Sequence, residues 1–261
     1  MIRKGSIVKV LLAGVLSFCA GCARMPGMPS ERSDVPRPDK ELDFHVLYKQ
    51  NCSGCHGDNG RGGAAIPLNN PALLAVAGPD NLRNIISRGL SPTLMPAFAA
   101  SAGGMLTEQQ VNALVRGMNS EWAHGAEFSS VALPPFSATT PGNAADGQKA
   151  YTAACARCHG ADGTGIKTTS PTASDQPVAT PHSIVDPSYL ALVDDVSLRS
   201  YVIAGHLDAN APDWRSYVSG HPLTSQEITD IVAWIATHRA PVAEQSLNTP
   251  RTTPGVAKEK P

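Results

Sequence analysis

The sequence contains few of the residues that build a large apolar core or a charged binding surface. Aromatic side chains make up 5% of the 261 residues, and charged side chains make up 16%. The 21 basic and 22 acidic residues nearly balance, and no basic stripe runs along the chain. Because proteins that bind nucleic acid carry such a stripe, this composition argues against nucleic acid as a partner.

Long apolar runs are also scarce. One run, Ile7 to Phe18, lies near the start of the chain and is interrupted by Lys9. It is too short for a permanent membrane span, which needs about 20 apolar residues. Arg3 and Lys4 precede it, and a basic start followed by a short apolar run is typical of a secretory signal. We therefore expect residues 1–21 to be a signal peptide.

The predicted signal ends at Cys19-Ala20-Gly21-Cys22. This segment resembles the cleavage box of bacterial lipoproteins, in which Cys22 becomes the lipidated first residue. Cys19 departs from the pattern, which usually has Leu there. Ordinary signal cleavage nearby is the alternative. The resemblance implies export to the periplasmic side of a bacterial membrane and a lipid anchor at Cys22.

Four of the six cysteines lie in two copies of one motif. Cys-x-x-Cys-His occurs at residues 52–56 and again at residues 155–159, and a glycine follows each copy. This is the attachment signature of c-type haem, in which both thiols bond to the porphyrin and the histidine ligates the iron. The motifs predict two covalent haems, held by Cys52 and Cys55 with His56, and by Cys155 and Cys158 with His159.

Other uses of paired cysteines do not fit this spacing. A zinc ribbon places its two pairs about 15–20 residues apart, whereas Cys55 and Cys155 are 100 positions apart. A disulfide scaffold is shorter and richer in cysteine. A thioredoxin-like motif does not require histidine after both pairs. Haem would also add apolar mass to a chain with few aromatics and stabilise its folded state.

The two motifs belong to an internal repeat. In the first copy, Asn70-Pro71 is followed eighteen positions later by Gly89 and six further on by Met95. In the second copy, Asp186-Pro187 is followed at the same spacings by Gly205 and Ala211. In both copies a capping-box threonine then begins a final helix with apolar residues at helical spacing. The threonines are Thr107, with Gln110, and Thr224, with Glu227.

Each copy resembles the class I cytochrome c fold. The resemblance implies an all-α protein with two tandem cytochrome c domains, each made of a few short helices wrapped around a covalent haem. The family packs its first helix against its last, which suits Tyr48 with Trp122 and Tyr151 with Trp234. The expected organisation is a signal (1–21), a tether (22–40), domain 1 (41–122), a linker (123–143), domain 2 (144–239) and a disordered tail (240–261).

The first haem has a clear pair of iron ligands. His56 is the proximal ligand, and Met95 is the predicted distal ligand, because a thioether is soft, uncharged and flexible enough to reach the iron. Met105 precedes the final helix and Met118 lies on its apolar face, so both are weaker candidates. In the family a proline carbonyl steadies the proximal imidazole, and Pro67 is placed to do so here.

The second haem lacks this methionine. Methionine does not occur after His159, and Ala211 stands at the position that matches Met95. His206 lies five residues before Ala211 and is the candidate sixth ligand, with His221 a weaker one. A five-coordinate or water-bound iron is the other outcome, and a ligand from Met105 or from a partner is remote.

The repeat predicts an electron-transfer protein rather than an enzyme. Dihaem chains of this type resemble cytochrome c subunits of quinol-oxidising or oxidase complexes, which implies a respiratory redox partner at the membrane. The alternative is a haem enzyme or small-ligand binder that uses an open second haem for peroxide, NO or CO. His206 or Asp213 would then serve as the acid–base group. A gas sensor is a third possibility, but the sequence contains no output domain for it.

Overall fold

The computed structural model describes residues 37–91, 93–123, 125–166 and 183–240. Helices supply all the regular structure of these residues, together with two isolated bridges. The all-α prediction is confirmed. The predicted signal, Cys22 and the tail from residue 241 lie outside the described residues. The chain divides into a unit of residues 1–41, whose described helix is η3 (Pro38–Lys40), and a unit of residues 42–261.

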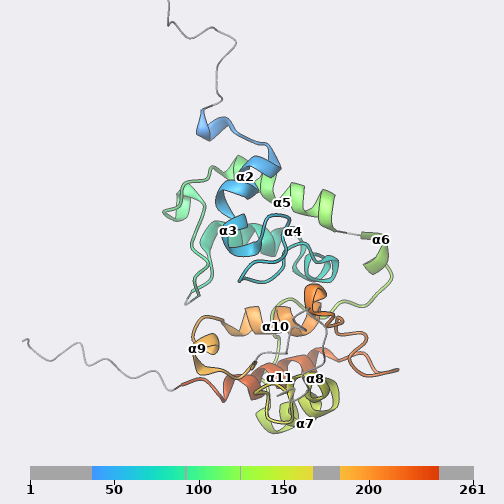
Figure 1. The fold of residues 1–261 in the computed structure, drawn as a ribbon. Coiled ribbons are helices and arrows are strands. Elements are labelled where there is room, and N and C mark those ends of the chain that lie inside the picture. The colour runs from blue at the N-terminus through green and yellow to red at the C-terminus, as the bar shows by residue number, and fades with distance from the viewer. Residues whose placement is uncertain (1–36, 92, 124, 167–182, 241–261) are drawn as a thin grey trace, which may run out of the picture. The chain divides into compact units, whose positions relative to one another are not determined.

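Domain 1 consists of four α-helices in the order predicted for a cytochrome c domain (Figure 1). They are α2 (Phe44–Asn51), α3 (Ser53–His56), α4 (Pro71–Arg88) and α5 (Glu108–Trp122), with the short η4 (Ala100–Ala102) before α5. Side-chain caps mark where these helices begin. The Asn70 side chain accepts from two backbone N–H groups of α4, and Thr107 with Gln110 forms the predicted capping box of α5.

Domain 2 repeats this order, with two helices, α9 (Pro187–Leu190) and α10 (Asp195–Ala204), in the place of α4. Its other helices are α7 (Ala144–Ala154), α8 (Ala156–His159) and α11 (Ser225–Ala236), with η5 (Leu207–Ala209) after α10. Thr224 and Glu227 form the second predicted capping box. The equivalence of the two copies, inferred from spacing alone, is therefore confirmed at the level of the helices and their caps.

The first and last helices of each domain pack together as predicted. In domain 1 the rings of Tyr48 and Trp122 meet edge to face, with centroids 5.1 Å apart. In domain 2 the rings of Tyr151 and Trp234 stack at 4.1 Å. Gly147 allows α7 to approach α11 closely, because a Cβ there would lie 1.9 Å from the Asp230 carbonyl oxygen. In each domain, the helix that precedes the haem motif is therefore packed against the last helix.

The linker packs against domain 2. It contains one short helix, α6 (Gly125–Phe128), whose Phe128 side chain is buried. Further along, the Pro135 carbonyl accepts a hydrogen bond of 3.0 Å from Nε of the buried Arg199 in α10. At its end, the backbone N–H of Asn143 donates to Asp230 Oδ1 of α11 at 2.7 Å. The linker thus contacts domain 2 at several points along its length.

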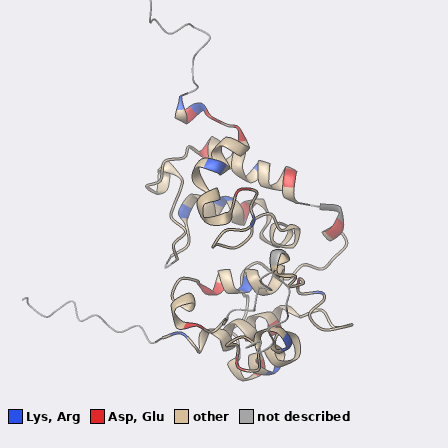
Figure 2. Cartoon of the chain, viewed as in Figure 1, with Lys and Arg blue, Asp and Glu red and all other residues tan. Residues whose placement is uncertain are grey.

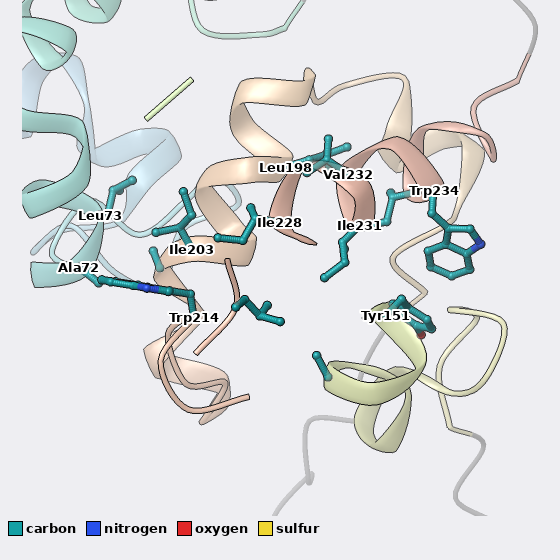
Figure 3. Close-up of a cluster of buried hydrophobic side chains, with 14 of the residues drawn as sticks. Ala72, Leu73, Tyr151, Leu198, Ile203, Trp214, Ile228, Ile231, Val232 and Trp234 are labelled. Atoms are coloured by element: carbon teal, nitrogen blue, oxygen red, sulfur yellow. The ribbon is translucent and has the colours of Figure 1, made fainter. Parts of the chain in front are cut away.

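The two domains share a buried contact. Asn70 caps α4 through its Oδ1 and donates through Nδ2 to the Ala204 carbonyl oxygen of α10 at 3.1 Å. Asn70 is 2% exposed. Ala72 and Leu73 of α4 belong to one cluster of buried side chains with residues of domain 2, including Trp214 (Figure 3). The start of α4 is therefore joined to the end of α10.

Asn70→Asp is expected to weaken this contact while keeping the helix cap. A carboxylate still accepts from the α4 N–H groups, but it cannot donate to the Ala204 carbonyl and would face it across a buried space. We expect a loss of about 1–3 kcal/mol in the unfolding free energy of the holoprotein, measured by denaturant titration. Asp186→Asn is the matched control, because Asp186 caps α9 in the second copy and is exposed. Equal losses in both variants would contradict the role of Asn70 between the domains.

Candidate haem sites

Each attachment motif forms one turn of helix directly after the first helix of its domain. The backbone N–H of His56 donates to the Cys52 carbonyl at 3.0 Å, and that of His159 donates to the Cys155 carbonyl at the same distance. Residues three apart on a helical turn share a face, so both thiols of each motif lie on one side. Cys52, Cys55, Cys155 and Cys158 are free thiols in the described structure.

A tyrosine holds the end of each motif. The Tyr48 hydroxyl donates to the Gly57 carbonyl at 2.8 Å, and the Tyr151 hydroxyl donates to the Gly160 carbonyl at 2.6 Å. Burial raises the pKa of both phenols, so they are neutral donors at physiological pH. The same tyrosines pack on the last helix, and they therefore connect the motif to that helix.

Burial also sets the protonation of the attachment residues. It raises the pKa of the Cys52 thiol to about 12, and the nearby Cys55 adds to the rise by charge repulsion. The pKa of the Cys155 thiol is raised to about 12 for the same reasons, with Cys158 as the neighbour. These sulfurs lie in apolar surroundings that favour an uncharged group, which a thioether is. Burial lowers the pKa of His56, so its imidazole is neutral and able to ligate a metal.

The carbonyl that steadies His56 is that of Ile66. His56 Nδ1 lies 2.8 Å from the Ile66 oxygen. Since a carbonyl can only accept, Nδ1 donates and Nε2 is left with its lone pair for iron. The expectation that the Pro67 carbonyl makes this contact is wrong by one residue. Proline disfavours a helical conformation in the residue before it, so Pro67 contributes by keeping Ile66 extended.

The distal loop of domain 1 begins where α4 ends. Gly89 has a φ of 71° and turns the chain out of the helix. The Leu90 N–H then donates to the Met95 carbonyl at 3.0 Å, and the Phe98 N–H donates back to Ile86 of α4 at the same distance. Met95 thus lies between two backbone hydrogen bonds that fix this loop.

The rival methionines lie in different surroundings. Met105 is 85% exposed, and Met118 is 1% exposed within the core between α5 and its neighbours. Met95 is half-buried. A half-buried methionine can turn toward a bound group, whereas Met118 is fixed in the core and Met105 points into solvent, so the burial pattern favours Met95.

The distal loop of domain 2 follows the same course. Gly205 has a φ of 65° after α10, and the Trp214 N–H donates back to Ile203 at 3.0 Å. Between them, His206 and Ala211 exchange two backbone hydrogen bonds of 3.1 Å and form an antiparallel bridge. Ala211 therefore occupies the position that matches Met95, as the spacing of the repeat predicted.

His206 lies beside that position. Residues directly opposite in an antiparallel bridge place their side chains on the same face. The imidazole of His206 is thus on the face of the Ala211 methyl group. Its Nδ1 is buried and has no hydrogen-bond partner among the described residues. The ring of Tyr201 lies parallel to the imidazole, with centroids 6.4 Å apart. A histidine with a buried, unpaired ring nitrogen at the place of a missing ligand fits a metal-binding group.

His221 has a different environment. Its Nε2 lies 3.0 Å from Glu227 Oε1, and the side chain is 54% exposed. Glu227 is the capping-box residue of α11, so His221 belongs to the start of that helix. Of the two histidines considered from sequence, His206 pairs with Ala211 in the distal loop, and His221 pairs with Glu227 at the start of α11.

Comparisons with known families match both halves of the chain. Residues 144–239 match the model of the family Cytochrome c, and residues 39–116 match the model of Cytochrome C oxidase, cbb3-type, subunit III. The protein is a dihaem c-type cytochrome. Two covalent c-type haems are its cofactors, which the thiol pairs, the proximal histidines and the buried Nδ1 of His206 fit.

A solved structure resembles this cytochrome distantly. A chain of the reducing HAO-like protein complex of Kuenenia stuttgartiensis is 18% identical to it, with a TM-score of 0.42, and the match covers 78% of this chain and 99% of that chain. No curated protein matches the cytochrome. In the described part of the chain, every helix is too short or too polar to cross a membrane.

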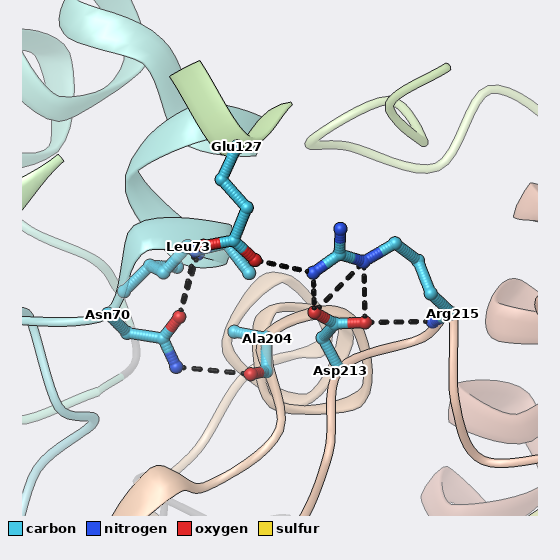
Figure 4. Close-up of polar contacts among 7 residues, drawn as sticks. Asn70, Leu73, Glu127, Ala204, Asp213 and Arg215 are labelled. Carbon is cyan, nitrogen blue, oxygen red and sulfur yellow. Dashed lines mark hydrogen bonds and ion pairs between the residues drawn. The ribbon is translucent and has the colours of Figure 1, made fainter. Parts of the chain in front are cut away.

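One group of residues at the distal loop of haem 2 was not predicted from sequence. Arg215 binds Asp213 through Nε and Nη2, and its Nη2 also lies 2.8 Å from Glu127 Oε1 of the linker (Figure 4). Asp213 was considered as an acid–base group, but the structure pairs it with Arg215. No sequence pattern links these residues, because Glu127 is 88 positions away from Arg215.

Proposed function

We propose that this cytochrome carries electrons between respiratory partners on the periplasmic side of a bacterial membrane, to which a lipid on Cys22 anchors it. The basic and apolar start of the chain and the cleavage box before Cys22 support export and lipidation. The match of residues 39–116 to an oxidase subunit model supports a quinol-oxidising or oxidase complex as the partner. Acidic and basic side chains are interspersed on the helices in Figure 2, which gives no support for a nucleic-acid partner.

The contact between the domains is the observation that carries this proposal. Ile66, whose carbonyl holds His56, packs against the same buried cluster that contains Ile203 and Trp214 of domain 2. Asn70, four residues further on, bonds to Ala204 directly before the distal loop of haem 2. The segment that holds His56 in domain 1 therefore contacts the start of the distal loop in domain 2. This contact suits an electron carrier that uses both haems.

We propose Met95 as the sixth ligand of haem 1 and His206 as that of haem 2, opposite His56 and His159. When bound, the haem iron supplies one-electron exchange between its two oxidation states. Met/His ligation gives a higher potential than bis-His ligation. With haem bound, Met95 would therefore make haem 1 the better electron acceptor, and His206 would keep haem 2 at the lower potential.

An enzymatic role for haem 2 would need an acid–base side chain on its distal side. Asp213 is bound by Arg215 and has a side-chain exposure of 15%. His206 is the residue that we assign to the iron. With both groups in use, we assign electron transfer rather than catalysis to haem 2.

The anchor is tested by Cys22→Ser in the full chain, expressed in a bacterium that matures c-type cytochromes. We expect the wild-type cytochrome in the membrane fraction and the variant in the soluble periplasmic fraction, each with two haems per chain. Quinol-fed membranes should reduce the wild type faster than the variant, because tethering raises the local concentration. Cys19→Leu, which restores the usual cleavage-box residue, is the control and should stay in the membrane. Membrane retention of Cys22→Ser would rule out the lipid anchor.

A further inference from the structure

The distal loop of haem 2 is held by residues that lie outside domain 2. We infer that Glu127 and Phe128 of the linker helix α6 are positioning residues for this loop, which fix His206 through Arg215 and Trp214. The inference rests on the proposed ligation of haem 2 by His206. It makes the ligand state of haem 2 a property of the whole chain, because α6 also contacts α4 of domain 1.

The polar half of this contact is a carboxylate–guanidinium–carboxylate chain. Arg215 Nε lies 3.0 and 3.1 Å from the two oxygens of Asp213, and Arg215 Nη2 lies 2.6 Å from Asp213 Oδ2. Glu127 Oε1 then accepts from the same Nη2 at 2.8 Å. The Arg215 side chain is 29% exposed. The forked contact with Asp213 is firmer than a surface ion pair, and Glu127, whose side chain is 51% exposed, adds one further contact.

The apolar half is a stack of three groups. The Phe128 ring lies 6.0 Å from that of Trp214 at an interplanar angle of 25°, and both side chains are buried. The Arg215 guanidinium lies over the Phe128 ring, with its carbon 4.5 Å from the ring centroid. Aromatic and cation–π contacts of this kind contribute on the order of 1 kcal/mol each. Phe128 thus packs against Trp214 of the distal loop, and Glu127 binds Arg215 of the same loop.

Trp214, against which Phe128 packs, is connected to His206 through the backbone of the distal loop. Trp214 is the point at which the loop returns to α10, through its hydrogen bond to Ile203. Three residues before it, Ala211 forms the bridge to His206. Pro212 lies between them and restricts the backbone. A shift of Trp214 therefore moves Ala211 and, through two backbone hydrogen bonds, moves His206.

Domain 1 closes its distal loop differently. The residue after Phe98 is Ala99, at the position that matches Arg215. Ala99 forms a bridge to Leu106 of its own domain. The loop of Met95 is thus held from within domain 1, and haem 1 serves as an internal reference for any effect of the linker on haem 2.

The test compares Glu127→Gln and Phe128→Ala in the full-length holoprotein with the wild type. The measurement is CO binding to the reduced protein, followed at the Soret band, together with the near-infrared Met-to-iron band of haem 1 in the oxidised protein. We expect CO binding at haem 2 to accelerate about tenfold in Phe128→Ala and several-fold in Glu127→Gln, as the loop releases His206 more often. The Met band of haem 1 should not change.

Two controls separate positioning from general destabilisation. Glu121→Gln removes a carboxylate that pairs with His45 at 3.2 Å in domain 1, and it should bind CO like the wild type. Phe128→Tyr keeps the ring and should also behave like the wild type. Wild-type CO binding in Glu127→Gln, which is isosteric and keeps the fold, would overturn the inference, as would equal changes at both haems. If His206→Ala leaves haem 2 unchanged, the proposed ligation fails instead.

Discussion

Met95→Ala is expected to abolish the near-infrared Met-to-iron band and to lower the potential of haem 1. The thioether favours the ferrous state, so its removal stabilises the ferric state. Axial ligands set haem potentials over a range of about 0.8 V, and we expect a fall on the order of 0.1 V or more. Redox titration of the purified holoprotein, followed at the Soret band, measures this change.

The other methionines provide the controls for this result. Met105→Ala should have no effect on the band, because the side chain is 85% exposed. Met118→Ala should keep the band but destabilise domain 1 by about 2–5 kcal/mol, because it creates a cavity in the core. A band that survives in Met95→Ala would show that another group ligates haem 1.

His206→Ala is expected to open haem 2. Removing the imidazole leaves the Ala211 methyl group at the distal position, and a methyl group cannot ligate iron. The ferric spectrum should lose one low-spin bis-His signal and gain a high-spin one, and the reduced protein should bind one CO per chain at a rate at least about tenfold above the wild type. Electron paramagnetic resonance and CO titration measure the two effects.

His221→Ala is the matched control for His206→Ala. His221 is paired with Glu227 at the start of α11, and its side chain is more than half exposed. Its removal should leave both haem spectra unchanged and cost at most about 1 kcal/mol of stability. A low-spin signal that is lost in His221→Ala and kept in His206→Ala would reverse the assignment of the ligand.

Local sequence patterns predicted the parts of the structure that depend on near neighbours. Thr107 with Gln110, and Thr224 with Glu227, satisfy the first backbone donors of their own helices, so the capping boxes were readable from three-residue spacings. The haem motifs were equally local. The equivalence of Met95 and Ala211 followed from counting, because both domains keep the same number of residues between the helix-ending glycine and the ligand position.

The contacts of the linker, and those between the two domains, could not be predicted. Residues 123–143 were predicted only as a linker. No pattern in them showed that Phe128 would stack on Trp214 or that the Pro135 carbonyl would bond to Arg199. The second role of Asn70 was also hidden, since a cap needs only its side-chain oxygen. In hindsight, the difference between Asn70 and Asp186 at one repeat position was a signal, because only the amide can also donate to Ala204.

The carbonyl that binds His56 belongs to Ile66, whereas the sequence predicted that of Pro67. Sequence places a proline near the proximal histidine, but which carbonyl points at Nδ1 depends on the backbone dihedrals of the segment. Ile66 and Leu68 pack against the buried cluster that contains Ala72, Leu73 and residues of domain 2, and this packing acts on those dihedrals. A one-residue shift of a carbonyl therefore lies beyond what the motif can specify.

The central claim is that the two haems of this cytochrome are not equivalent. The most direct test is near-infrared magnetic circular dichroism of the oxidised, full-length holoprotein, scaled to total haem from its pyridine haemochrome. We expect a Met/His charge-transfer band for half of the haem, and a bis-His charge-transfer band at shorter wavelength for the other half. Met95→Ala and His206→Ala should remove the two bands separately. Methionine intensity for all of the haem, or for none, would contradict the claim.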